Sequence, residues 1–158
     1  MSRRKETILE KLQQAGLVIL LLPIILPLSA IGFTLFLLHR VVLYLLIWIV
    51  WLPKGKDTLL VYSDGPIWRD YMIQEILPLV QERAVVLNWS ERRNWHRWAF
   101  PAYIFRSFAG GQKYNPVVML FRPFRRVEIF RFWSAFKDWK HGHTDSVNEI
   151  RNQLLLRL

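Results

Sequence analysis

The sequence contains no cysteine. This absence excludes disulfides, metal sites built on thiolates and thiol nucleophiles. It does not indicate the redox compartment in which the chain works, because a chain without cysteine is compatible with every compartment.

The chain also lacks the short motifs that mark many enzymes and nucleotide-binding proteins. It has no G-x-x-x-x-G-K-[ST] phosphate loop, no G-x-G-x-x-G, no H-E-x-x-H and no G-x-S-x-G. It has no internal repeat and no low-complexity segment. We therefore predict that the protein has no cofactor, no metal site and no catalytic residue.

Charge is missing from one long stretch of the chain. Residues 17–52 read LVILLLPIILPLSAIGFTLFLLHRVVLYLLIWIVWL and contain a single charged residue, Arg40. A helix that spans a membrane needs about 20 apolar residues. We therefore predict a basic N-terminal tail over residues 1–16 and a hydrophobic membrane anchor over residues 17–52.

The length of the anchor leaves three arrangements open. In the first, residues 17–38 span the bilayer, Arg40 lies at the far interface and residues 41–52 lie along that surface. In the second, the anchor is a hairpin that bends at residues 29–32. In the third, one tilted helix buries Arg40 against a partner, since a charge at the bilayer centre costs about 2.5–3.5 kcal/mol. Positive charge beyond both ends of the anchor favours the hairpin, with both ends in the cytoplasm.

Aromatic and basic residues mark the end of the anchor. Trp48 and Trp51 precede Lys54 and Lys56. Indole rings favour the level of the lipid head groups, and lysine side chains just beyond it can reach the water. We predict that these four residues contact the membrane surface.

The remaining chain, residues 57–158, is long enough for one compact domain. From Lys54 onward it carries 17 basic and 10 acidic residues, a net charge of +7. A basic balance suits anionic lipid head groups or nucleic acid, and the neighbouring anchor favours the lipid. We predict the bilayer and a protein or peptide as partners, with the domain on the cytoplasmic face and nucleic acid disfavoured.

Hydrophobic patterning predicts an α/β domain with the element order β-α-β-α-β-β-α. The expected strands and helices alternate until a final hairpin and a last helix. Pro78 should kink the first helix, and Pro101 should interrupt the second. The strand expected at residues 117–121 has no alternation, as a central strand covered on both faces would. The expected ranges are strands at 57–63, 84–88, 117–121 and 127–133, helices at 66–83, 90–108 and 145–158, and an aromatic-basic segment at 134–143.

This order resembles the thioredoxin fold over residues 57–158. The junction of the first strand and helix reads Asp64-Gly65-Pro66-Ile67, which is similar to the redox motif C-G-P-C with both cysteines replaced. Pro116 falls where the family has its cis-proline. The resemblance implies a member that cannot exchange thiols and disulfides, and that binds extended peptide around the motif and the proline. It makes Asp64, Trp68 and Pro116 the candidate partner-binding residues.

Two of the acidic candidates have a plainer structural explanation. Asp64 can cap the helix that follows it, and this is the interpretation we favour for its carboxylate alone. His141, His143 and Asp145 resemble the H-x-H-x-D metal run of metallo-β-lactamase-fold hydrolases. Ser146 stands where that family has a further histidine, so we favour a polar loop in which Asp145 caps the last helix.

Two segments mix arginine with aromatic residues. The first contains Arg92, Arg93 and Trp95, and we predict that these three contact the membrane surface. The second consists of Arg122, Arg125, Arg126 and Arg131 with Phe121, Phe124, Phe130, Phe132 and Trp133. Such a mixture can also lie on a lipid surface, but aromatic residues in strands are ordinary core residues, and we favour core burial for the strand aromatics of this set.

Two functions follow from these observations. The first is a membrane-anchored, redox-inactive, thioredoxin-like binding or scaffold domain that acts at the membrane surface. The second is a small membrane-associated enzyme for an anionic, lipid-type substrate, with arginines as the clamp and Asp64 or His96 as the base.

Overall fold

The computed structural model describes residues 2–96, 99–110, 115–142 and 144–158, and the exposure of side chains from residue 20 onward. The chain divides into two compact units, Met1–Val42 and Leu43–Leu158. We describe each unit by itself.

The first unit consists of most of helix α1, which runs over Ser2–Val50. Pro23 and Pro27 lie inside the helix, and residues 29–32, the expected hairpin bend, are helical as well. The hydroxyl of Thr34 donates to the main-chain oxygen of Ala30 at 2.8 Å, so this polar group is satisfied within the helix. Side chains 20–39 are exposed. The segment Leu20–Lys54 is long and apolar enough to span a membrane.

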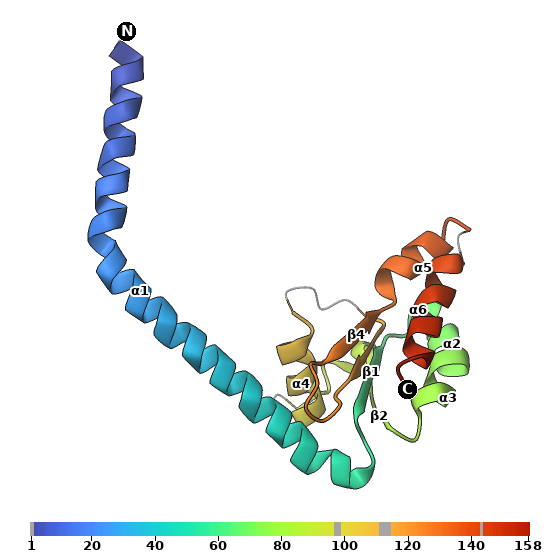
Figure 1. Ribbon diagram of the computed structural model, residues 1–158. Coiled ribbons are helices and arrows are strands. Elements are labelled where there is room, and N and C mark those ends of the chain that lie inside the picture. The colour runs from blue at the N-terminus through green and yellow to red at the C-terminus, as the bar shows by residue number, and fades with distance from the viewer. Residues whose placement is uncertain (1, 97–98, 111–114, 143) are drawn as a thin grey trace. The chain divides into compact units, whose positions relative to one another are not determined.

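The second unit is built on a four-stranded mixed sheet (Figure 1). The strands are β1 (Thr58–Tyr62), β2 (Ala84–Asn88), β3 (Val117–Leu120) and β4 (Glu128–Arg131), in the order β2-β1-β3-β4. β1 pairs with β2 in parallel, while β3 runs antiparallel to both β1 and β4. The parallel first pair and the final hairpin confirm the α/β prediction.

Side chains of the two central strands alternate between two apolar clusters, as the period of two in a strand requires. Leu59, Val61, Val117 and Met119 point into one cluster. Leu60, Val118 and Leu120 point into the other. Both strands are therefore covered on both faces, and this explains why the sequence of β3 shows no alternation between apolar and polar residues.

One face of the sheet is covered by helix α4 (Phe100–Phe108) and by the last turns of α1. Leu43, Ile47 and Trp51 are 2%, 0% and 4% exposed and belong to the core of this unit. They are spaced by four residues, so they form one stripe on the helix. The compact domain thus begins at Leu43 rather than at residue 57, and the end of the apolar run is one of its core elements.

The other face is covered by the remaining helices (Figure 1). They are α2 (Trp68–Tyr71), the π-helical turn η2 (Met72–Ile76), α3 (Leu77–Val80), α5 (Trp133–Trp139) and α6 (Asp145–Leu155). The first three form one helical stretch. Its π-helical part lies just before Pro78, which has no N–H to continue the α-helical pattern.

The structure corrects two of the helix predictions. The helix expected over residues 90–108 begins only at Phe100 among the described residues, after a short 3₁₀ turn η3 (Trp89–Glu91). Pro101 lies in the first turn of α4, where its missing N–H costs nothing, so it starts the helix instead of interrupting it. The aromatic-basic segment that follows β4, to which no helix or strand was assigned, contains most of helix α5.

Candidate functional site

The strand register brings four separate segments to one end of the sheet. Tyr62 pairs with Asn88 at the end of the parallel strands, and Val61 pairs with Val117 at the start of β3. Val117 in turn pairs with Arg131 at the end of β4. We call this the carboxyl end of the sheet, and we call the opposite end, where β1 begins, the entry end. Ligands of open α/β sheets bind at the carboxyl ends of parallel strands.

Asp64 follows β1 and is held at the carboxyl end by side chains of β2 and of the segments that follow both strands. Asn88 Nδ2 donates to both carboxylate oxygens of Asp64 at 3.1 Å, and the Asp64 N–H donates to Ser90 Oγ at 2.9 Å. Arg69 Nε lies 3.4 Å from Asp64 Oδ1. The N-cap residue of α2 is Ile67, and it makes no side-chain capping bond. The Asp64 carboxylate therefore joins the ends of β1 and β2 and is not the cap that we expected.

Trp68 lies beside Asp64 and covers the turn before α2. Its indole N–H donates to Ser63 Oγ at 3.2 Å. A Cβ added at Gly65 would lie 2.0 Å from Trp68 Nε1, so the turn can hold only a glycine while the indole stays in place. Trp68 also contacts the Trp133 ring edge-on, with 5.5 Å between the ring centroids.

Lys137 of α5 and Lys140, the residue after this helix, complete this aromatic surface. Lys140 Nζ lies 5.3 Å from the centre of the Trp68 ring, and Lys137 Nζ lies 5.4 Å from that of Trp133. Ile67, which precedes Trp68 in the chain, is 40% exposed. The carboxyl end thus offers partly exposed indoles and an exposed aliphatic side chain, which suit an apolar side chain of a partner. The two ammonium groups add positive charge beside this apolar surface.

Pro116, the third predicted partner-binding residue, also lies at the carboxyl end. It is buried, its peptide bond with Asn115 is cis, and its main-chain oxygen accepts a hydrogen bond from the Phe132 N–H at 3.0 Å. Buried in this way, Pro116 fixes the start of β3 against the end of β4. The side chains that remain open to a partner are those of Asp64 and Trp68.

The predicted membrane-surface residues are divided between the two ends of the sheet. Arg92, Arg93 and Trp95 follow β2 and therefore lie toward the carboxyl end. The Arg92 guanidinium stacks over the Trp89 ring at 5.4 Å, and Trp95 packs edge-on against the same ring. Arg93 is exposed.

The other four predicted membrane-surface residues precede β1 and lie toward the entry end. Lys54 is exposed, and Lys56 Nζ donates to the main-chain oxygen of Glu82 at 2.9 Å. Trp48 is partly buried, and Trp51 packs edge-on against Phe121 inside the core. The burial of Trp51 gives its indole a packing role in the domain that requires no lipid.

The possible metal run does not form a cluster in the part of the chain that the structure describes. No group of three or more His, Asp or Glu side chains able to hold a metal ion occurs there. His143 lies outside the described residues, and His141 is exposed. Thr144 is the N-cap of α6 and Asp145 occupies its first turn, so Asp145 complements the helix dipole without capping the helix.

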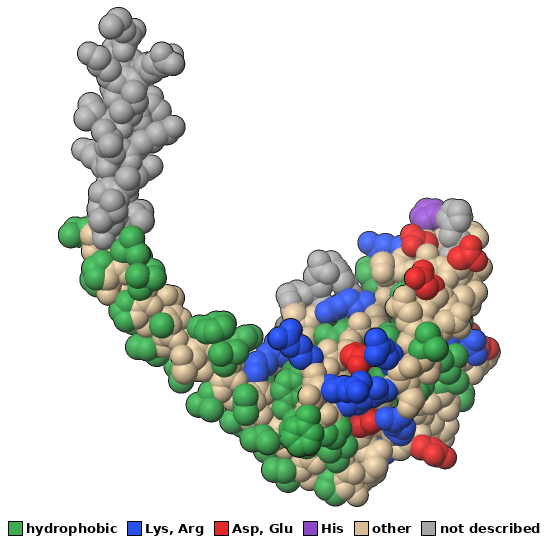
Figure 2. All heavy atoms as spheres, in the orientation of Figure 1, with side chains coloured by type: hydrophobic (Ala, Val, Ile, Leu, Met, Phe, Trp, Pro, Cys, Tyr) green, Lys and Arg blue, Asp and Glu red, His purple; other side chains and the backbone are tan. Residues whose placement is uncertain are grey.

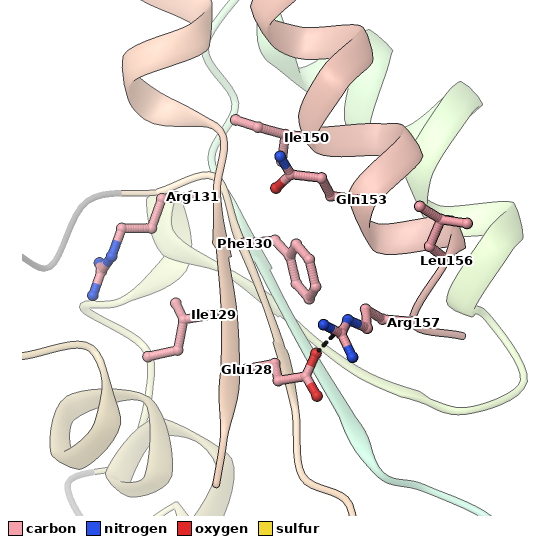
Figure 3. A pocket seen from close by; sticks show the side chains of 8 residues that line it. All are labelled: Glu128, Ile129, Phe130, Arg131, Ile150, Gln153, Leu156 and Arg157. Atoms are coloured by element: carbon pink, nitrogen blue, oxygen red, sulfur yellow. Dashed lines mark ion pairs between the residues drawn. The ribbon is translucent and has the colours of Figure 1, made fainter.

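A surface pocket of about 400 Å³ lies between β4 and α6 (Figure 3). Glu128 and Arg157 form an ion pair across it, with 3.5 Å between Oε2 and Nε. Phe130 points into it from β4, with Gln153 and Leu156 on the side of α6. None of the predicted site residues lines this pocket, and no sequence motif pointed to it.

No protein-family model, no curated protein and no solved structure matches this chain.

Proposed function

We propose that the chain is a membrane-anchored, redox-inactive, thioredoxin-like binding domain that captures a protein or peptide segment at the membrane surface. The strand order β2-β1-β3-β4, with β3 antiparallel to both neighbours, supports the thioredoxin-like assignment because that fold has the same arrangement. Helices on both faces of the sheet support it as well. Asp64 and Ile67 replace the two motif cysteines, so the proposed activity is binding and not thiol exchange.

The anchor in this proposal is a single span. Helix α1 is exposed over residues 20–39, and burial in the domain begins at Leu43. Residues 20–42 measure about 35 Å at 1.5 Å per residue, which is enough for a hydrocarbon layer of about 30 Å. Arg40 then lies near the interface, where its guanidinium can reach the head groups.

The observation that carries the proposed function is the convergence of Asp64, Trp68 and Trp133 at the carboxyl end. The indoles and Ile67 present apolar surface, while Lys137 and Lys140 place positive charge over the rings. We propose an extended partner segment that places an apolar or aromatic side chain against Trp68. Aromatic anchors of this kind dominate the binding energy of many interfaces.

We also propose that the domain faces the cytoplasm. Its net charge of +7 from Lys54 onward suits the anionic cytoplasmic leaflet. An enzymatic function is not part of the proposal, because the Asp64 carboxylate already accepts two hydrogen bonds from Asn88 and pairs with Arg69.

Photo-crosslinking in the native membrane tests the partner site. A photoreactive residue replaces Ile67, which is 40% exposed, and a matched control carries the same residue at Leu155, which is 42% exposed. The proposal predicts a discrete protein adduct from position 67 that Trp68→Ala removes and that position 155 does not give. Identical adducts from both positions, or an adduct insensitive to Trp68→Ala, would contradict it.

A second experiment tests the motif alignment separately. Because the chain has no cysteine, the double variant Asp64→Cys/Ile67→Cys introduces the only two thiols. A thioredoxin-like junction brings such a pair within bonding distance, so an intramolecular disulfide should form under mild oxidant. If both thiols still react with an alkylating reagent after oxidation, the result would count against the alignment of residues 64–67 with the redox motif.

A further inference from the structure

The turn between β3 and β4 presents an unusual apolar side chain to the outside. Phe124 is 92% exposed and has a φ of 59°. A left-handed φ is uncommon for a bulky residue, and an exposed phenyl ring gains nothing from burial. The left-handed backbone conformation of Phe124 costs free energy, and residues held in such conformations concentrate at functional sites.

Three arginines flank Phe124 in the chain. Arg122, Arg125 and Arg126 lie within two residues of Phe124, and the Arg125 N–H closes the turn by donating to the Arg122 main-chain oxygen at 3.3 Å. Within the described part of the chain, no carboxylate pairs with any of the three guanidinium groups. The turn is therefore an apolar tip with three positive charges that form no ion pair with a described carboxylate.

The turn is fixed to the end of the anchor helix. Leu120 pairs with Thr58, so the turn lies at the entry end of the sheet, where β1 begins. The Phe124 and Trp48 rings are in contact, with 5.2 Å between their centroids. The Val127 N–H, at the far side of the turn, donates to the Tyr44 hydroxyl at 2.8 Å.

The same stretch of helix has an outward apolar face. Leu45 and Ile49 are 46% and 69% exposed, while Leu43 and Ile47, on the opposite side of the helix, are buried. Figure 2 shows Lys and Arg side chains next to hydrophobic side chains on the face of the domain turned to the viewer. Apolar side chains beside arginines are typical of surfaces that lie in the interface of an anionic bilayer.

We propose that residues 122–126 form a membrane-docking turn. Phe124 enters the interfacial region of the bilayer, and the three arginines contact the phosphates of anionic lipids. This inference rests on the membrane anchoring of the proposed function. It commits to lipid because the turn is attached to the helix that carries the apolar span, so the bilayer surface is its nearest anionic partner.

The docking turn also orients the domain. The carboxyl end with Trp68 lies beyond β1, a strand of five residues that covers about 16 Å at 3.3 Å per residue. With the entry end against the lipid, the carboxyl end faces the water. The partner surface and the membrane surface are thus separate ends of one sheet.

The depth of the turn can be measured in the full chain, which has no cysteine background. Pro123→Cys, at an exposed position, carries an environment-sensitive fluorophore and leaves Phe124 intact. The protein is reconstituted in phosphatidylcholine vesicles with or without phosphatidylserine, and nitroxides on the lipid acyl chains act as quenchers. We expect a blue-shifted emission that the nitroxides quench when phosphatidylserine is present.

Variants and a matched probe position make the test specific. Each of Arg122→Gln, Arg125→Gln and Arg126→Gln should lower the docked-to-undocked ratio about fivefold, equivalent to about 1 kcal/mol. Phe124→Ser should abolish the blue shift. The same fluorophore on Asn148→Cys should report water in both vesicles. Asn148 is exposed in the first turns of α6, whereas Arg157, which pairs with Glu128 at the start of β4, lies beyond the other end of that helix.

The outcomes separate this inference from the proposed function. A probe at position 123 that reports water in anionic vesicles, while the protein resists alkaline extraction, overturns the docking turn and leaves the anchor standing. Release of the protein by alkaline extraction overturns the anchor and the docking turn together. Quenching that does not depend on phosphatidylserine or on the arginines also overturns the proposed lipid contact.

Discussion

The hydroxyl of Tyr44 accepts a hydrogen bond of 2.8 Å from the main-chain N–H of Val127. The two residues are 83 positions apart in the chain. This contact joins the end of the apolar helix to the residue that follows the docking turn and precedes β4. The end of the apolar helix, which the sequence assigns to the membrane anchor, is therefore packed into the domain.

Tyr44→Phe is expected to destabilise the domain by about 1–2 kcal/mol, because it leaves the Val127 N–H without its acceptor. The ring contact with Phe108 is retained in this variant. Thermal unfolding of the full chain in detergent, followed by circular dichroism, measures the change. Tyr62→Phe is the matched control, since its hydroxyl has no hydrogen bond among the described residues, and it should change stability by less than about 0.5 kcal/mol.

A second prediction compares two isoleucines on the same helix. Ile47 is fully buried in the domain core, while Ile49 is 69% exposed. Ile47→Ala should cost about 2–5 kcal/mol, because it leaves a cavity under the sheet, and Ile49→Ala should cost less than about 0.5 kcal/mol in detergent. Equal effects of the two substitutions on the unfolding midpoint would contradict a domain that begins at Leu43.

Gly65→Ala tests the turn that carries Trp68. The added Cβ would lie 2.0 Å from Trp68 Nε1, so the indole must leave its place over the turn and lose the bond to Ser63. With fluorinated tryptophan, the Trp68 resonance, identified by Trp68→Phe, should shift. The other seven of the eight tryptophans in the chain provide internal references. Gly32→Ala, where nothing lies within 4 Å of the new Cβ, should leave every resonance in place.

Tyr71 gives a prediction for alkaline pH. Burial raises the pKa of the Tyr71 phenol above its ordinary value, Arg151 opposes this shift, and Glu75 adds to it. The folded state then holds its proton at pH values where the unfolded chain has lost it, so stability falls as the pH rises through the ordinary tyrosine pKa of about 10. The Tyr71 hydroxyl is also buried without a hydrogen-bond partner among the described residues.

Tyr71→Phe removes both the titration and the unsatisfied hydroxyl. It should leave stability at neutral pH within about 1 kcal/mol of the parent, or raise it. Above the ordinary tyrosine pKa, the variant should lose less stability than the parent does. Urea unfolding at neutral and alkaline pH measures both effects, and parallel losses in the two proteins would argue against the burial of the phenol.

Hydrophobic patterning predicted the sheet better than the helices. β2 has the predicted bounds, and the other three strands lie within their predicted ranges. The sequence could not show that Leu43, Ile47 and Trp51 face the core of the domain, because the residues between them are apolar as well. Helix α5 did leave a pattern, since Phe132, Ala135, Phe136 and Trp139 recur at helical spacing, but the aromatic and basic composition of the segment obscured it.

The sequence predicted where Asp64 and Trp68 lie in the fold, but it did not predict which residues they contact. The element order alone placed Asp64 and Trp68 at the junction of the first strand and helix. Asp64 and Asn88 are 24 positions apart in the chain, and the bonds between them depend on the register of β1 against β2, which local patterns do not specify. In the sequence, the docking turn was only part of a segment that mixes arginine and aromatic residues. The sequence could not show that Phe124 is exposed, because exposure is a property of the folded chain.

The central claim is a single-span anchor with the domain against the cytoplasmic leaflet, and thiol labelling of intact cells tests it most directly. The two reporters are Lys5→Cys in the N-terminal tail and Asn148→Cys at an exposed position of α6. With an impermeant reagent, the account predicts that the Lys5 reporter reacts and the Asn148 reporter reacts only after permeabilisation. Reaction or protection of both reporters would contradict the single span, and reaction of the Asn148 reporter alone would contradict the cytoplasmic placement of the domain.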